Sequence, residues 1–137
     1  MLDKLKINNL EIITMEAGNL YHGLKESDDG YDKFGEVYFS SIKKNKIKAW
    51  KMHTKMKMNL IVMSGEIRFN FIDLSKNIIE RYEINLSINN YKRITVNPGL
   101  VFGFKGISDN NILVNIANIA HDDNEVMNYD IKEYNFI

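Results

Sequence analysis

The sequence predicts an all-β domain, a jelly-roll barrel of two packed sheets with little helix. Three observations lead to this prediction. Apolar and polar residues alternate along most of the chain, as is typical of half-buried strands. Turn-forming residues interrupt the alternation at short spacing, as they do in sandwiches and barrels. The chain of 137 residues also offers few stretches that suit a helix.

The expected strands follow one another from residue 36 onward. In the first, residues 36–42, Val37 and Phe39 alternate with Tyr38 and Ser40. Residues 59–63 form the next strand, in which Asn59 is followed by an unbroken apolar run, as expected for a strand buried on both faces. Further strands are predicted at 47–53, 66–72, 81–86, 91–96 and 112–119. Helix is expected only as a turn at 22–27 and as a short C-terminal helix at 124–134.

Two blocks organise this pattern. The first, Ile47–Asp73, contains a strand, His53, a second strand, the Ser64-Gly65 turn and a third strand. The second, Ile94–Phe104, holds the single proline of the chain in Asn97-Pro98-Gly99. Two strand-turn-strand blocks at this separation suggest a cupin-type double-stranded β-helix. His53 then occupies the position where such a barrel holds its functional histidine.

Composition and charge exclude several classes of function. The chain is 45% hydrophobic and 26% charged with zero formal net charge, which is ordinary for a globular protein with one domain over residues 1–137. Without a basic excess, we expect binding to neither nucleic acid nor a membrane surface. The lack of cysteine excludes disulfides, thiolate catalysis and Cys-ligated zinc. No signal peptide or membrane-spanning run is recognisable, so a cytoplasmic location is expected.

Metal ligands are missing from the positions where a metal-binding cupin carries them. Such sites use two histidines two residues apart, because alternate residues of a strand face the interior together. Here Lys51 stands two residues before His53, and Lys57-Met58-Asn59 occupies the region of the expected glutamate. Phe102 takes the place of the second block's histidine. We therefore expect no metal and no cofactor, and a metal-dependent cupin oxygenase is the weakest hypothesis.

His53 is a candidate general base, although a structural histidine bonded to backbone is the alternative. Histidine titrates near neutral pH and can remove a proton without a metal. Such a base needs a carboxylate to orient it, for which Asp130 and Glu125 are candidates. An enolate needs hydrogen-bond donors, for which Lys51 and Lys57 are candidates. A tyrosine could serve as the opposing acid, but the sequence does not single one out.

Other aromatic and basic residues could contact a nucleotide. Trp50 could stack on a base, although a core aromatic is the interpretation we favour. Arg68 and Arg93 lie on predicted strands, and the planar fork of arginine suits a diphosphate. A solvated strand face is the simpler explanation of both arginines.

Several segments together carry a family resemblance: Gly18–His22, Phe34–Ser40, Ile47–His53, Asn59–Val62 with Gly65-Glu66, Tyr91–Val96, Pro98-Gly99 and Gly103-Phe104. With these segments the chain resembles the dTDP-4-dehydrorhamnose 3,5-epimerase-like family, the sugar-nucleotide branch of the cupins. The resemblance implies a metal-free homodimer with His53 as base and Asp130 as its partner. It also implies that His22 helps to bind a nucleotide-sugar substrate. Residues 5–15 could supply a strand exchanged between subunits.

The resemblance implies a metal-independent epimerase or isomerase that acts on a nucleotide-linked 4-keto sugar in surface polysaccharide synthesis, such as that of lipopolysaccharide. The chain departs from the family in three places. The family's arginine before the base is lost in Trp50–His53, its lysine falls at Met58, and its tyrosine falls in Leu113–Asn115, which contains none. Two alternatives therefore stay open. One is a dTDP-4-keto-sugar 3,4-ketoisomerase, and the other is a non-catalytic degenerate cupin that binds a nucleotide sugar.

Overall fold

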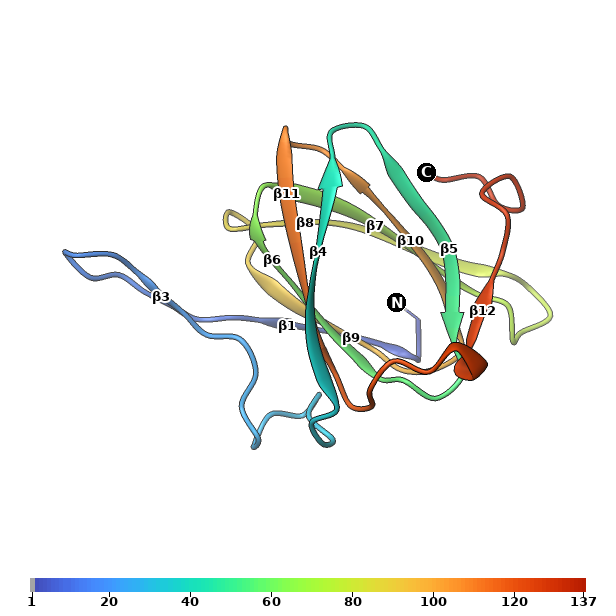
Figure 1. Cartoon of the computed structure of the whole chain (residues 1–137), viewed down its shortest axis with the longest axis horizontal. Coiled ribbons are helices and arrows are strands. Elements are labelled where there is room, and N and C mark those ends of the chain that lie inside the picture. Colours follow the sequence, from blue (N-terminus) through green and yellow to red (C-terminus); the bar gives the residue numbers. More distant parts are fainter. Residues whose placement is uncertain (1) are drawn as a thin grey trace.

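The computed structural model describes residues 2–137, and nearly all of the regular structure in this range is antiparallel strand (Figure 1). The strands are β1 (Leu5–Asn9), β2 (Ile12–Ile13), β3 (Leu20–Tyr21), β4 (Glu36–Lys43), β5 (Ile47–His53), β6 (Met58–Ser64), β7 (Glu66–Asp73), β8 (Glu80–Ser87), β9 (Lys92–Val96), β10 (Leu100–Gly106), β11 (Asn110–Ala117) and β12 (Val126–Asn128). The only helical element in this part of the chain is the 3₁₀ turn η1 (Asp123–Glu125). None of the described residues forms a helix that could cross a membrane.

Two five-stranded sheets pack against each other. One has the strand order β1-β9-β6-β11-β4, and the other has the order β12-β5-β10-β7-β8. The consecutive strands β4 and β5 belong to different sheets, so the chain crosses between the sheets at the turn that joins them. This arrangement confirms the predicted jelly-roll barrel. The short β2–β3 hairpin extends away from both sheets (Figure 1).

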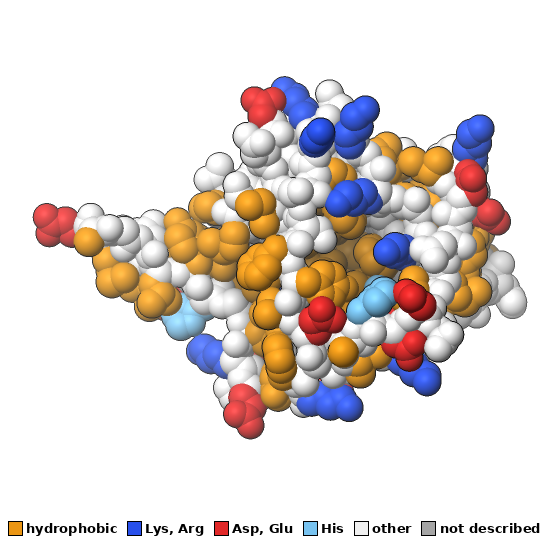
Figure 2. All heavy atoms as spheres, in the orientation of Figure 1, with side chains coloured by type: hydrophobic (Ala, Val, Ile, Leu, Met, Phe, Trp, Pro, Cys, Tyr) orange, Lys and Arg blue, Asp and Glu red, His pale blue; other side chains and the backbone are white. Residues whose placement is uncertain are grey.

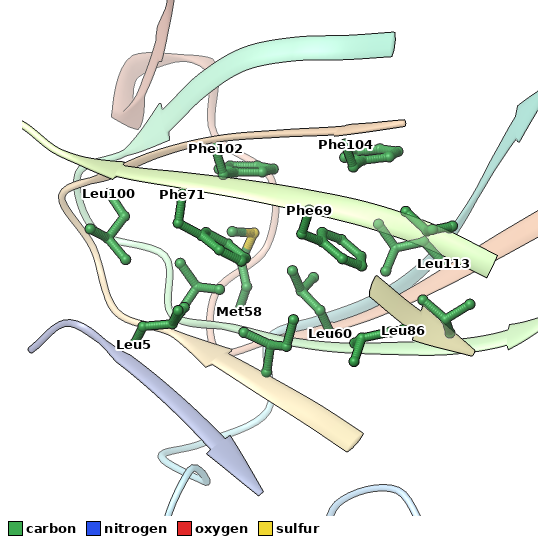
Figure 3. Packing of buried hydrophobic residues seen from close by; sticks show 14 of the residues in the cluster. Leu5, Met58, Leu60, Phe69, Phe71, Leu86, Leu100, Phe102, Phe104 and Leu113 are labelled. Carbon is green, nitrogen blue, oxygen red and sulfur yellow. The ribbon is translucent and has the colours of Figure 1, made fainter. Parts of the chain in front are cut away.

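The main hydrophobic core fills the space between the sheets (Figure 3). On β7, Ile67, Phe69 and Phe71 are fully buried in this core, as their alternation with polar residues predicts. Burial of one such side chain contributes about 1.5–3 kcal/mol. The Ser64-Gly65 turn joins β6 to β7, and Gly65 adopts a φ of 76°, a conformation that glycine tolerates best. The core therefore follows the predicted strand pattern closely.

The predicted helices are wrong. Residues 22–27 contain no helix, and the segment 124–134 forms only the end of η1, then β12, and then turns. β12 pairs with β5, which would otherwise be the edge of its sheet. Pairing with β12 gives hydrogen-bond partners to the backbone N–H and C=O groups at the edge of β5. A helix at this place would leave these groups unpaired. The requirement of the sheet thus overrides the weak local preference for helix.

A second apolar cluster lies on the outer face of the sheet that contains β5. Trp50 is its centre, only 1% exposed, and packs with Tyr134 and Phe136 of the C-terminal segment. The Trp50 indole N–H donates to the carbonyl oxygens of Ile131 (3.3 Å) and Tyr134 (3.1 Å). These contacts hold the C-terminal segment that follows β12 against the outer face of this sheet.

Candidate active site

A cavity of about 720 Å³ opens between β4, an edge strand of one sheet, and β5 of the other sheet. Its lining comes from both sheets and from the chain after β11: Glu36, Tyr38, Ser40, Lys48, Ala49, Trp50, Lys51, His53, Met58, Leu60, Phe102, Phe104, Leu113, Asn115, His121, Asn128 and Tyr129. Figure 2 shows the hollow, with hydrophobic side chains at its floor and charged side chains around it. The cavity is of the size and apolar character of small-molecule sites.

His53 is the last residue of β5 and lines this cavity. Only 6% of its surface is exposed. Its ring stacks on Phe102, with 5.8 Å between the ring centroids. The backbone N–H of Gly99, in the Pro98-Gly99 turn, donates to the carbonyl oxygen of His53 at 2.8 Å. The two sequence blocks therefore meet at this histidine, and a phenyl ring occupies the position where a metal-binding cupin has an imidazole.

Glu125 is the carboxylate partner of His53. Its Oε2 lies 2.5 Å from Nδ1 of His53. Its Oε1 accepts hydrogen bonds from the backbone N–H groups of Lys55 (3.1 Å) and Met56 (2.8 Å). With Nδ1 engaged in this way, Nε2 is the ring nitrogen that a ligand in the cavity can use. The pair thus has the geometry of a base that is oriented by a carboxylate.

The environment of Glu125 favours its ionised form. Burial is the largest influence and raises the pKa of the carboxyl group. The hydrogen bonds from His53 and from the backbone of Met56 and Lys55 together outweigh burial, so the pKa of Glu125 is lowered from its ordinary value. An ionised Glu125 stabilises a protonated His53 by direct charge contact.

Asp130, the partner of His53 implied by the family resemblance, does not occupy that position. Its side chain is exposed, and its Oδ1 accepts a hydrogen bond from the backbone N–H of Lys132 at 2.8 Å. The cause is the register of β12, which pairs Val126 with His53. Glu125 comes immediately before that pair, whereas Asp130 lies beyond the end of the strand. Of the two candidates that sequence reasoning left open, the structure selects Glu125.

Tyr38 is a tyrosine that the sequence did not single out. It lies directly opposite Asn115 in the β4–β11 ladder, and the Asn115 amide donates to its hydroxyl oxygen at 2.7 Å. Burial raises the pKa of Tyr38, the Asn115 hydrogen bond partly offsets this, and the charges of Glu36 and Glu125 raise it further. The phenol therefore keeps its proton at neutral pH and can donate it.

Two lysines of β5 line the cavity. Lys51 lies on the same face of the strand as His53, as the two-residue spacing predicts. Lys48 also lines the cavity because the pairing of β5 with β10 contains a bulge: Phe102 pairs with Lys51, but Phe104 pairs with Lys48. Lys57, the other predicted enolate donor, lies outside the lining.

His121 was too distant in sequence to be grouped with His53, yet the loop after β11 brings it to the same cavity. Its Nε2 lies 2.6 Å from an oxygen of Asp123. Its backbone N–H donates to Glu36 at 2.9 Å. The cavity therefore contains two imidazoles, each with a carboxylate partner.

Of the remaining predicted binding residues, Trp50 alone borders this cavity. Trp50 borders the cavity, but its ring packs in the outer cluster, which confirms its interpretation as a core aromatic. Arg68 donates to the backbone oxygen of Ile137 at 2.7 Å and does not line the cavity. Arg93 and His22 line a separate cavity of about 390 Å³. Arg93 is committed there to the carbonyl oxygen of Gly23 at 2.8 Å.

Within residues 2–137, no group of three or more His, Asp or Glu side chains is arranged to hold a metal ion. In the cavity itself, His53 lies beside Phe102, and Lys51 lies on the same face of β5. A phenyl ring and an ammonium group are not metal ligands. The donor set of this cavity suits proton transfer and hydrogen bonding.

Comparison with solved structures supports the jelly-roll fold described above. A dTDP-sugar isomerase from Desulfovibrio desulfuricans has 25% sequence identity and a TM-score of 0.89, over 93% of this chain and 85% of that one. A 3,5-epimerase from Legionella pneumophila, solved with dTDP-4-keto-L-rhamnose, has 19% identity and a TM-score of 0.81 over 93% and 73% of the two chains. A 3,4-ketoisomerase from Thermoanaerobacterium thermosaccharolyticum, solved as a mutant with TDP-4-keto-6-deoxyglucose, has 17% identity and a TM-score of 0.80 over 93% and 88%.

These likenesses confirm the predicted resemblance to the epimerase-like branch of the cupins at the level of structure. No protein-family model matches the chain, and no curated protein matches it in sequence. The solved structures include both epimerases and ketoisomerases, so the shared fold by itself does not choose between the two reactions.

Proposed function

We propose that the protein is a metal-independent epimerase or isomerase of a nucleotide-linked 4-keto sugar, with His53 as the general base. The observation that carries the proposal is the buried His53–Glu125 pair at the end of a cavity of about 720 Å³. The likeness to dTDP-sugar isomerases and epimerases supports the choice of substrate class. Glu125 takes the orienting role in this proposal in place of Asp130.

The chemistry begins at the carbon beside the ketone. Nε2 of His53 takes the proton, and the electrons of the C–H bond form an enolate with its charge on the ketone oxygen. Lys51, on the same face of β5, donates a hydrogen bond to that oxygen. Glu125 stabilises the imidazolium that His53 has become.

Tyr38 completes the epimerisation from the opposite wall of the cavity. Its hydroxyl gives a proton to the other face of the enolate carbon, which restores the ketone with inverted configuration. The step leaves a phenolate on Tyr38 and an imidazolium on His53. Transfer of the imidazolium proton through solvent to the phenolate returns both groups to their starting states. Tyr38 thereby replaces the tyrosine that the family carries on the neighbouring strand.

The 3,4-ketoisomerase is the second candidate, and His121 is the observation that favours it. That reaction moves one proton from carbon 3 to carbon 4 and one from oxygen 3 to oxygen 4 through an enediol. It therefore needs a second acid and base, which the His121–Asp123 pair provides at the same cavity. A barrel that binds a nucleotide sugar without turnover is the third candidate, since the family's arginine and lysine are absent.

One experiment separates the three candidates. NMR of dTDP-4-keto-6-deoxyglucose in deuterated water would follow exchange with wild-type protein and with His53→Ala. Deuterium at carbon 3 or 5 with the ketone still at carbon 4 supports epimerisation, and deuterium at carbon 4 with the ketone at carbon 3 supports ketoisomerisation. Binding of dTDP without exchange supports the non-catalytic barrel. Equal exchange by wild type and His53→Ala contradicts the role of His53.

We further propose that two copies of the chain associate through the outer face of β4 and β11. Val37, Phe39 and Ile112 are 42%, 69% and 41% exposed on that face. Figure 2 shows hydrophobic side chains lying open to solvent beside the hollow. An uncovered apolar sheet face with a free edge strand is a common basis of a symmetric dimer.

The place of the protein in the cell is proposed from the sequence alone. A role in surface polysaccharide synthesis, including lipopolysaccharide, follows from the resemblance to sugar-nucleotide epimerases. A cytoplasmic location agrees with that role, because activated sugars are substrates of soluble enzymes in the proposed class. Identification of the sugar that accumulates when the gene is deleted would test the role, and cell fractionation would test the location.

A further inference from the structure

We propose that Lys48 forms an anion subsite for the diphosphate of the substrate, at the end of the cavity away from His53. The inference rests on the proposed function for the identity of the substrate. Sequence periodicity did not identify Lys48, because residues 47, 49, 51 and 53 would share one face of a regular strand. The bulge between Lys48 and Lys51 turns Lys48 to the cavity side.

The contacts of Lys48 hold its ammonium group in place without neutralising it. Its Nζ donates to the carbonyl oxygen of Ser41 at 2.7 Å and lies 6.0 Å from the centroid of the Phe104 ring. An ammonium group has three donors, so two stay free for a ligand. Four other lysines form ion pairs with carboxylates: Lys4, Lys6, Lys44 and Lys76. Among the described residues, Lys48 forms none.

The charges of the cavity are arranged along its length. The Lys48 contact with Ser41 places it near the β4–β5 turn, where Ser40 also lines the cavity. Glu36, at the other end of β4, lies four residues from Ser40, which is about 13 Å along a strand. His53 lies five residues from Lys48 on β5, about 16 Å along a strand. An anion is therefore attracted to the Lys48 end and repelled from the Glu36 end.

This arrangement suits a ligand that has an uncharged sugar at one end and a diphosphate toward the other. The sugar then lies between His53 and Tyr38, and Lys51 donates a hydrogen bond to its ketone oxygen. The phosphates extend toward Lys48 and the Ser40 hydroxyl, and the nucleoside points to the opening. Lys48 is thus a binding residue, whereas Lys51 acts on the reacting group.

Binding measurements on wild type, Lys48→Met, Lys48→Arg and Lys105→Met test the subsite. The probes are dTDP, inorganic diphosphate and thymidine, each titrated by calorimetry. Lys105 is a matched control, because it lies on the neighbouring strand β10 and outside the cavity lining. We expect Lys48→Met to weaken dTDP binding about tenfold or more, as for loss of one charge-assisted hydrogen bond. Lys48→Arg and Lys105→Met should stay within about threefold of wild type.

The outcomes separate the subsite from the proposed reaction. Loss of dTDP and diphosphate affinity in Lys48→Met, with thymidine affinity unchanged, supports the subsite. Unchanged dTDP affinity in Lys48→Met overturns it, and so does an equal loss for thymidine. Failure of the wild-type protein to bind any of the anions also overturns it. The proposed function is tested separately, by deuterium exchange that depends on His53. The binding results for Lys48→Met therefore bear on the subsite and not on the reaction.

Discussion

The carboxylate of Glu125 lies 2.5 Å from Nδ1 of His53, although 72 residues separate the two in the chain. The contact depends on two features of the fold. The first is the β12–β5 pairing, which brings Val126 beside His53. The second is the pair of backbone N–H groups of Lys55 and Met56, which hold the other carboxylate oxygen. His53 and Glu125 are thus held together by one strand end and the loop that follows it.

Removal of the charge on Glu125 should slow proton transfer. We expect Glu125→Gln to lower the rate of deuterium exchange into the substrate by about 10²-fold or more, because a neutral amide stabilises the imidazolium poorly. The amide oxygen can still accept from the backbone of Met56, so the fold should persist. Asp130→Asn is the control, since its side chain contacts only local backbone. A larger loss in Asp130→Asn than in Glu125→Gln would contradict the assignment.

Stability should depend on pH through the same carboxylate. The pKa of Glu125 is lowered in the folded protein from its ordinary value of 4.5, so the unfolded chain binds more protons between the two values. Its contribution to the free energy of unfolding is present above the ordinary pKa and is lost as the pH falls through the folded value. We expect wild type to lose more stability than Glu125→Gln between about pH 7 and pH 3.

Urea denaturation at a series of pH values would measure this difference. Comparison of the two proteins removes the effect of other carboxylates that they share, such as Asp73, whose pKa is also lowered. Parallel stability curves for the two proteins over this range would show that Glu125 does not titrate as described.

Tyr38 should affect inversion more than proton removal. In Tyr38→Phe, His53 can still take the proton and return a deuteron to the same face, but the acid on the opposite wall is gone. We expect the rate of epimer formation to fall about 10²-fold or more, with a smaller effect on exchange. Tyr129→Phe is the control, since Tyr129 also lines the cavity but its ring packs on Tyr134. Equal rates of inversion in Tyr38→Phe and wild type would exclude Tyr38 as the acid.

The exposed face of β4 should control self-association. Phe39 is 69% exposed in the single chain, and a charge in its place would be buried unpaired at the proposed interface. We expect Phe39→Glu to weaken the dimer by about tenfold or more in sedimentation experiments. Ile78→Glu is the matched control, because Ile78 is 79% exposed in the turn between β7 and β8. A monomeric wild-type protein, or equal effects of the two substitutions, would contradict the interface.

Sequence reasoning predicted the barrel because the barrel is built from local patterns. The alternation in β7, the Ser64-Gly65 turn and the apolar run of β6 all appear where the printed sequence indicates them. His53 was identified for the same reason, since its place at the end of a strand is a local property. These features need no knowledge of distant parts of the chain.

The rest of the site depends on pairings between distant segments. The alternation of β4 does not reveal which face turns inward, and the usual expectation fails: Tyr38 lines the cavity while Phe39 is exposed. Lys48 depends on a bulge opposite Gly103, and a glycine within a strand does not by itself tell which side chain the bulge turns inward. Glu125 reaches His53, and His121 reaches the cavity, only because β12 and the loop before it return to β5. Each of these contacts is set by register and topology.

The alternation of β4 gives its two faces different surroundings. Tyr38 and Ser40 border the cavity, whereas Val37 and Phe39 lie on the exterior. A slip of one residue in the β4–β11 ladder would exchange these faces along the whole strand. Point substitutions can therefore alter ligand chemistry or surface association separately, but an insertion or deletion within this strand would disturb both together. Length variation among relatives of this chain should consequently fall in the turns at either end of β4 and spare the strand itself.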